Sequence, residues 1–156
     1  MLNNKPTAGY LQRSWGIYAA ASASIFLGAL IYLFLRPVPF IFLNWIDFYD
    51  MALVHSLRPL TVPLHTRLPE WMVFSLTNGL WTFAYALIMT HIWWGRRSFA
   101  GFFWLASVPL LGVCHELAQF FGFIPGTFCY QDLLAGFIGA CLGFWVVFQK
   151  KIKKAV

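Results

Sequence analysis

Two acidic residues, Glu116 and Asp132, lie within or beside strongly apolar stretches of a chain that has only five acidic residues among 156. His115 precedes Glu116, and Gln119 follows it by three residues, so these side chains share or border one face of a helix. Carboxylates can accept hydrogen bonds from a polar ligand, and Glu116 could act as a general base. Because ionisable groups inside membrane spans are costly and rare, we predict a functional site here.

The sequence HELAQ, which starts at His115, is not a zinc-protease motif. Gln119 replaces the second histidine, and glutamine is a poor zinc ligand. A divalent-ion site made of His115, Glu116 and Asp132 is a weaker alternative, so we expect no metal and no cofactor. No serine has a nearby base, and no cationic side chain is expected in the cluster to hold a phosphate. Whether the protein is an enzyme therefore stays open.

Each candidate residue also has a structural interpretation. Asp132 follows a turn and can cap the amino end of the next helix, whereas no capping role is evident for Glu116. Glu116 and Gln119 can form hydrogen bonds between helices, and His115 can be an ordinary interfacial histidine. The alternative function is then a structural or assembly subunit of a membrane complex, in which the polar residues serve helix packing.

The elements that must position these residues are membrane helices. The chain is 60% hydrophobic and 10% charged, a composition that soluble domains do not have. The net charge of +6 sits mostly in Arg96, Arg97 and a lysine-rich tail after Gln149. Such clusters beside spans set topology and contact anionic lipids, so we expect membrane lipids and no nucleic acid as partners. Residues 1–156 fit one transmembrane helical domain.

Four stretches supply the ~20 mostly apolar residues that a spanning helix needs. They are about 15–35, 71–94, 99–121 and 132–149. The stretch 40–57 is also apolar, but it contains Asp47 and Asp50. An acid at a span centre costs ~2.5 to 3.5 kcal/mol, so we predict an amphipathic helix in the membrane interface there. The expected fold is an all-α integral membrane protein with four transmembrane helices.

The distribution of Lys and Arg predicts the orientation of this fold. With four spans both termini lie on one side, together with eight of the 11 Lys and Arg residues. The other three, Arg36, Arg58 and Arg67, lie on the opposite side. The positive-inside rule therefore places both termini in the cytoplasm.

Polar residues of three spans reach a similar depth near the outer membrane surface. Ser75 and Asn78 are three residues apart on one face of the second span. Glu116 lies within about two turns of the outer end of the third span. We predict a pocket in the outer leaflet in which Glu116 and Asp132 accept hydrogen bonds, oriented by the substrate-binding residues Gln119, His115, Asn78 and Ser75.

Asp132 heads a stripe of glycines on the fourth span, at Gly136, Gly139 and Gly143. The spacings of four, three and four residues keep all four positions on one helix face. Small residues at such spacing let helix backbones pack closely in lipid. We therefore expect Asp132 to face the helix bundle and not the lipid.

The pattern from Glu116-x-x-Gln119 to Asp132 and its glycine stripe resembles the closing signature of the VanZ-like family of small bacterial integral membrane proteins. The stretch 75–81, SLTNGLW, is also similar to a segment of uncharacterised bacterial relatives. The turn lacks the usual arginine, Gly136 stands at the place of an asparagine, and Cys129 stands where relatives often carry an acid. The resemblance covers about a fifth of the chain.

This resemblance implies a role in the bacterial cell envelope and a location in the inner membrane. The family's biochemical activity is poorly defined, so the ligand comes from the residues. We expect a lipid or lipid-linked sugar headgroup to bind in the polar pocket. The aromatic exterior is expected to contact lipids, and it could also dock another membrane protein or a second copy of the chain.

Overall fold

The computed structural model describes residues 7–36 and 52–155, and all regular elements in these two ranges are helical. Three helices are long and apolar enough to cross a membrane, over Trp15–Leu35, Phe99–Phe120 and Tyr130–Lys150. They belong to α1 (Thr7–Leu35), α6 (Phe99–Phe120) and α7 (Tyr130–Ala155). The predicted all-α fold is confirmed for the described residues, and these helices coincide with three of the four predicted spans.

The outward faces of these helices are apolar. Large hydrophobic side chains on α6 and α7, among them Phe102, Phe103 and Phe137, are more than half exposed. In water such a surface would be unfavourable, whereas the hydrocarbon core of a bilayer accommodates it. The exposed apolar surface therefore agrees with helices that face lipid.

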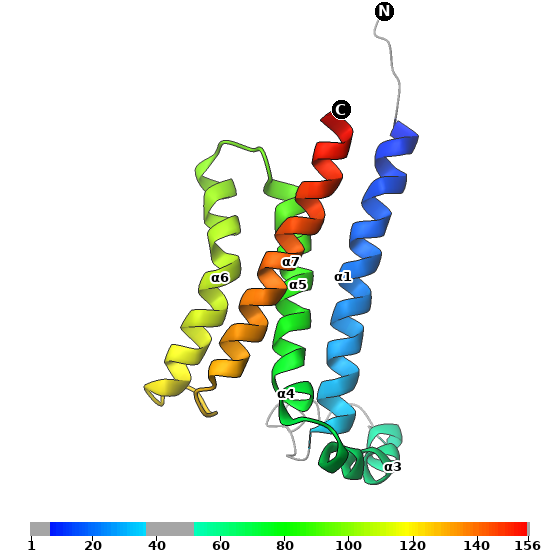
Figure 1. Ribbon diagram of the computed structural model, residues 1–156, viewed down its shortest axis with the longest axis vertical. Helices are drawn as coiled ribbons and strands as arrows, with labels where there is room; N and C mark the ends of the chain where they lie inside the picture. The colour runs from blue at the N-terminus through cyan, green and yellow to red at the C-terminus, as the bar shows by residue number, and fades with distance from the viewer. Residues whose placement is uncertain (1–6, 37–51, 156) are drawn as a thin grey trace, which may run out of the picture.

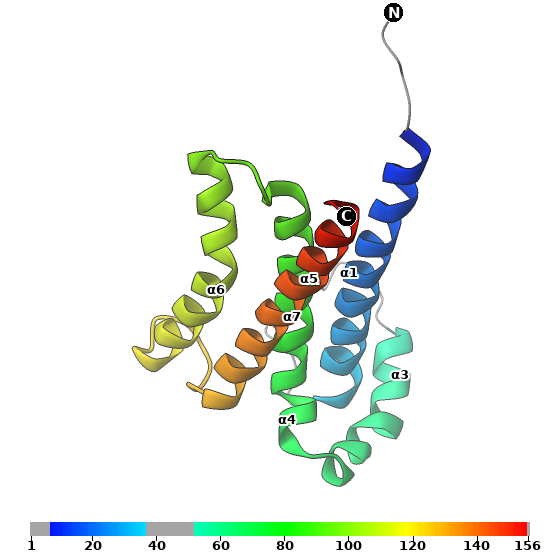
Figure 2. The ribbon, with the colours of Figure 1, turned by 45° about the horizontal axis from the view of Figure 1, so that its top comes forward.

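The second predicted span, 71–94, is divided in the structure. A short helix, α4 (Glu70–Val73), ends before Phe74, and α5 (Ser75–Trp93) follows. α5 is not among the three apolar helices, because it carries several polar residues, of which Ser75, Thr77 and Thr90 are buried. Figures 1 and 2 show α5 between the other long helices, so its polar groups face protein and not lipid.

The closest contact between helices joins α5 to α7. A Cβ atom on Gly139 would collide with the carbonyl oxygen of Gly79. A Cβ on Gly143 would lie 2.6 Å from Cβ of Ala86 and 2.9 Å from the Phe83 carbonyl oxygen. Only glycine allows the two backbones to approach this closely. The glycine stripe therefore packs inward against α5, as its spacing predicted.

The segment between α1 and α4 packs beside the end of α1. It contains α3 (Ala52–Thr61) and the 3-10 helix η1 (Val62–Arg67). The hydroxyl of Thr61 donates a hydrogen bond of 2.6 Å to the Phe34 carbonyl oxygen near the end of α1. Of the predicted interfacial helix 40–57, residues 40–51 lie outside the described part, and the remainder belongs to α3.

The connections between the long helices lie at the two opposite ends of the molecule. α3, α4 and the turn between α6 and α7 lie at one end in Figures 1 and 2. The start of α1, the connection from α5 to α6 and the end of α7 lie at the other end. Glu116 and Asp132 both lie close to the α6–α7 turn.

Candidate functional site

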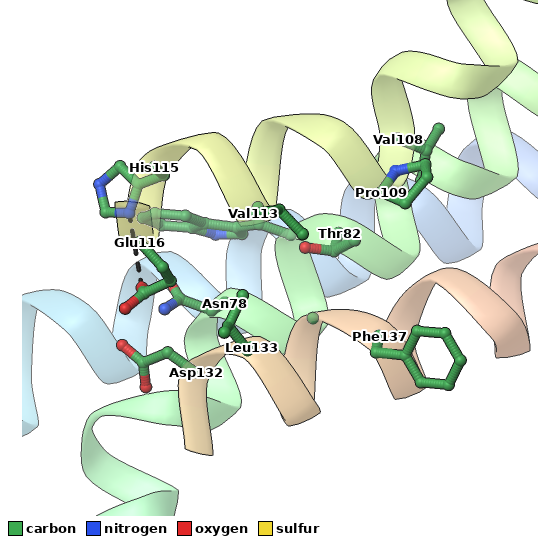
Figure 3. A pocket seen from close by; sticks show the side chains of 13 residues that line it. Asn78, Thr82, Val108, Pro109, Val113, His115, Glu116, Asp132, Leu133 and Phe137 are labelled. Carbon is green, nitrogen blue, oxygen red and sulfur yellow. Dashed lines mark ion pairs between the residues drawn. The ribbon is translucent and has the colours of Figure 1, made fainter. Parts of the chain in front are cut away.

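A cavity of about 340 Å³ between α5, α6 and α7 brings together four of the six predicted site residues. Its lining includes Glu116 and His115 from α6, Asp132 from α7 and Asn78 from α5. Figure 3 shows the carboxylates of Glu116 and Asp132 on the same side of the cavity, with the Asn78 amide near them. Three helices thus bring polar groups to one place, as the sequence predicted.

The cavity has a polar end and an apolar end. The carboxylates of Glu116 and Asp132 and the amide of Asn78 gather at one end of the cavity (Figure 3), and both acids lie close to the α6–α7 turn. Farther along α6 and α7 the lining consists of apolar side chains and glycines: Val108, Pro109, Gly112, Val113, Leu133, Gly136 and Phe137. Such a cavity suits a ligand with a polar group at one end and hydrocarbon at the other.

Glu116 uses one of its oxygens to cap α7. The residue is 3% exposed, and Oε2 accepts a hydrogen bond of 2.9 Å from the backbone N–H of Cys129, which directly precedes the first residue of α7. Oε1 lies 3.6 Å from Nδ1 of His115. The expectation that Glu116 has no capping role is therefore wrong.

The α6–α7 turn explains how a residue of one helix can cap the next. Gly122 and Gly126 in this turn have positive φ values of 71° and 137°, a conformation that glycine adopts readily. The turn folds the chain back, so that the last turn of α6 meets the start of α7. Sequence spacing alone did not indicate this contact, because Glu116 and Cys129 are 13 residues apart.

Asp132 has a different role from the one that its position after a turn suggested. α7 begins at Tyr130, so Asp132 is its third residue and not its cap. Its Oδ1 atom is buried, and among the described residues none donates a hydrogen bond to it. An acid in the first helical turn is favoured by the helix dipole. Asp132 therefore keeps an unused acceptor beside the cavity.

Arg36 is the residue near the site that sequence reasoning missed. Its Nη2 donates a hydrogen bond of 2.7 Å to the Phe74 carbonyl oxygen, and its guanidinium lies 4.5 Å from the ring centre of Tyr32. Burial lowers the pKa of Arg36, while electrostatic interactions with Tyr32 and Asp132 act in the opposite direction. Arg36 does not line the cavity, but it is a cation within electrostatic range of Asp132.

The structure does not bring Gln119 and Ser75 into this cavity. The Gln119 side chain packs against Gly126 in the turn, where a Cβ atom would collide with it. Ser75 is 2% exposed and lines a second cavity, on another side of α5. Trp81, which sequence reasoning had not singled out, lines the first cavity from α5.

A metal centre has no support in the part of the chain that the structure describes. No three His, Cys, Asp or Glu side chains come together there in a way that could hold a metal ion. The candidate set of His115, Glu116 and Asp132 does not form such a group. The donors present suit hydrogen bonding to an organic ligand better than ligation of an ion.

Comparisons with known proteins add no relative. No family model matches the chain, and no curated protein and no solved structure matches it either. The VanZ-like resemblance therefore stays a prediction from the closing signature.

Proposed function

We propose that this protein is a VanZ-like cell-envelope membrane protein whose cavity between α5, α6 and α7 binds the polar headgroup of a lipid or lipid-linked sugar. The observation that carries the proposal is Asp132, which lines this cavity and whose Oδ1 is buried without a hydrogen-bond donor among the described residues. A hydroxyl or ammonium group of a ligand would supply that donor. Asn78 and His115 would orient the bound group.

The shape of the cavity supports an amphipathic ligand. Its polar residues lie next to the α6–α7 turn, where headgroups would lie, and its apolar residues continue along the helices. Glycines at positions 112 and 136 keep this space open, because neither has a side chain that would fill it. A purely polar solute would leave the apolar end of the cavity without a partner.

The proposed topology has four transmembrane helices in the bacterial inner membrane. α5 is the additional span in this arrangement and the second in chain order, with its polar side chains covered by α1, α6 and α7. Both termini lie in the cytoplasm, on the side of Arg96 and Arg97. The cavity then opens in the outer leaflet, where precursors and lipids of the envelope are exposed.

Binding has more support than catalysis. Glu116 would be the general base of an enzyme, but one of its oxygens is occupied by the backbone of Cys129. A base that holds a helix end in place is poorly suited to exchange protons with a substrate. Asp132 is the better candidate for direct contact with a ligand.

A structural subunit is the second candidate, and one observation favours it. The apolar side chains of α6, among them Phe99 and Phe102, are strongly exposed on a helix that packs against its neighbours over a limited surface. Another membrane protein could cover this face. In that case the Glu116 cap would serve only to fix the hairpin of α6 and α7.

The test compares Asp132→Asn and Glu116→Gln with a matched control, Glu70→Gln, which changes an exposed acid outside the cavity. Each variant is expressed in the native bacterium after deletion of the wild-type gene, and the amount of folded protein in the membrane is measured. Sensitivity to a glycopeptide and envelope lipid composition are then compared. We expect Asp132→Asn to reproduce the deletion phenotype and Glu70→Gln to behave as wild type.

The expected result for Glu116→Gln is intermediate, because the amide oxygen can still accept the Cys129 N–H. If Asp132→Asn and Glu116→Gln both fold and complement fully while the deletion has a phenotype, headgroup binding in this cavity is contradicted. The structural subunit would then be the better account.

A further inference from the structure

A second cavity, of about 550 Å³, lies between α1, α5 and α7 and has no role in the headgroup site. We propose that it holds one acyl chain of a membrane phospholipid, from the leaflet next to the α6–α7 turn. The proposal goes beyond headgroup binding and requires only that the helices lie in a bilayer. It follows from the shape, length and polarity of the cavity.

The cavity opens where α1 and α7 separate. Near the cytoplasmic end of the proposed topology the two helices meet α5 in a buried apolar cluster that includes Ile17, Ala21 and Val147. Toward the other end α1 and α7 diverge, and α5 lies between them (Figures 1 and 2). The result is a groove with α5 as its floor, closed at one end by this apolar cluster.

The length of the groove matches one leaflet. Its lining on α7 runs from Gln131 to Leu142, and on α5 from Ser75 to Phe83. At 1.5 Å per residue the α7 part is about 16 Å long, roughly half of the ~30 Å hydrocarbon core. An acyl chain lying along the groove would therefore stay within one half of the bilayer.

The polar groups of the groove lie mainly at its outer end. Trp71, Ser75 and Gln131 lie there, whereas Ser24 lies deeper and satisfies its hydroxyl by donating to the Ala20 carbonyl oxygen, at 2.9 Å. Ser75 is 2% exposed, and its hydroxyl has no hydrogen-bond partner among the described residues. This hydroxyl is inaccessible from the groove, so the exposed side chains of Trp71 and Gln131 present the hydrogen-bond donors of this end.

A phospholipid matches both the polar outer end of the groove and its apolar walls. The oxygens of its ester linkages lie at the boundary of the hydrocarbon region and can accept hydrogen bonds from the exposed side chains of Trp71 and Gln131. The acyl chain below these oxygens packs against the apolar walls of the groove, which have no hydrogen-bonding groups for water.

The test uses the full-length protein in lipid nanodiscs that contain phosphatidylglycerol with a diazirine in one acyl chain. After irradiation, cross-linked residues are identified by mass spectrometry. We expect labelling of groove residues Leu80, Leu134 and Ile138 to exceed that of Phe102, on the exposed face of α6, by about fivefold. Loosely associated lipid would label both surfaces equally, and that result would overturn the proposal.

Substitutions in the groove provide the second part of the test. Ser24→Leu fills the groove and should reduce its labelling by about fivefold, while Ala23→Leu, at the exposed neighbouring position, should leave it unchanged. If Ser24→Leu does not fold, Ala135→Leu fills the same groove from α7. Unchanged labelling in the folded groove variant contradicts the proposal.

The headgroup proposal can be separated from this one. Asp132→Asn alters the first cavity and should leave the labelling of the groove residues unchanged. If headgroup binding is lost while the groove residues are still labelled, the acyl-chain proposal stands. If headgroup binding is intact and the groove residues are not labelled above Phe102, only the acyl-chain proposal is rejected.

Discussion

Asp132 places an unused hydrogen-bond acceptor inside an apolar bundle. A buried polar atom without a partner is unfavourable by about 1–3 kcal/mol, more for a charged group. Arg36 interacts electrostatically with Asp132, but it does not line the cavity. A ligand that donates a hydrogen bond to Oδ1 would remove this unfavourable energy, which therefore favours ligand binding.

Glu116 differs from Asp132 because its carboxylate already has a backbone partner. Glu116→Ala removes the acceptor of the Cys129 N–H and should lower the free energy of unfolding by about 1–3 kcal/mol. Glu116→Gln keeps an oxygen at this place and should lose less than half of that. Reversible unfolding of the purified variants in detergent micelles measures both values, and an alanine variant as stable as wild type would contradict the capping role.

The α5–α7 contact holds the cavity in shape at the scale of elements. The stripe of Gly139 and Gly143 lets α7 lie directly on α5, and its first turn carries Asp132 to the cavity. α6 is tied to α5 by a hydrogen bond of 2.7 Å between the hydroxyls of Tyr85 and Ser107. The close α5–α7 pair therefore forms the fixed wall, and α6 completes the site.

A substitution in the stripe should separate α5 from α7. A methyl group at position 143 would lie within 3 Å of Ala86 and Phe83, so Gly143→Ala should destabilise the protein by about 1–3 kcal/mol. Gly112→Ala is the matched control, because a Cβ there would meet nothing within 4 Å. The control should be neutral or slightly stabilising, since alanine favours helix. Equal stability of the two variants would contradict the close packing.

The sequence predicted the helices and the inward stripe because both depend on local patterns. Apolar length predicts spans, and glycine spacing indicates a packing face. The cap on α7 and the position of Arg36 depend on the chain fold, since Glu116 reaches Cys129 across a turn and Arg36 reaches Phe74 from 38 residues away. The span predicted over 71–94 is divided at Phe74 in the structure, and apolar length gives no indication of this break.

The whole molecule is expected to have a fixed orientation in the membrane. Cysteine-free protein, made by replacing Cys114, Cys129 and Cys141, can carry one new cysteine at Thr127 or at Arg97, both of which are exposed. A membrane-impermeant maleimide should label Thr127→Cys in intact cells and Arg97→Cys only after the membrane is opened. Labelling of both sites from outside would contradict the four-span topology, because the two loops would then lie on one side.

The cluster of basic residues around Arg96 and Arg97 lies at the end of the molecule opposite the α6–α7 turn. Both cavities have their polar residues near the α6–α7 turn end, whereas Arg96, Arg97 and the lysine-rich tail lie at the other. The basic end can contact anionic lipids of the cytoplasmic leaflet. The opposite end would then be left to recognise lipids through hydrogen bonds and shape.

Binding of a lipid headgroup at Asp132 can be measured by native mass spectrometry of the purified protein. The probes are phosphatidylethanolamine, phosphatidylglycerol and an undecaprenyl-pyrophosphate-linked sugar, each tested with wild type, Asp132→Asn and Glu70→Gln. A hydrogen bond to a charged group contributes about 1.5–3 kcal/mol, so Asp132→Asn should weaken binding of the preferred probe by about tenfold or more. Glu70→Gln should bind it like wild type. Equal retention of every probe by folded Asp132→Asn and wild type would contradict headgroup binding at Asp132.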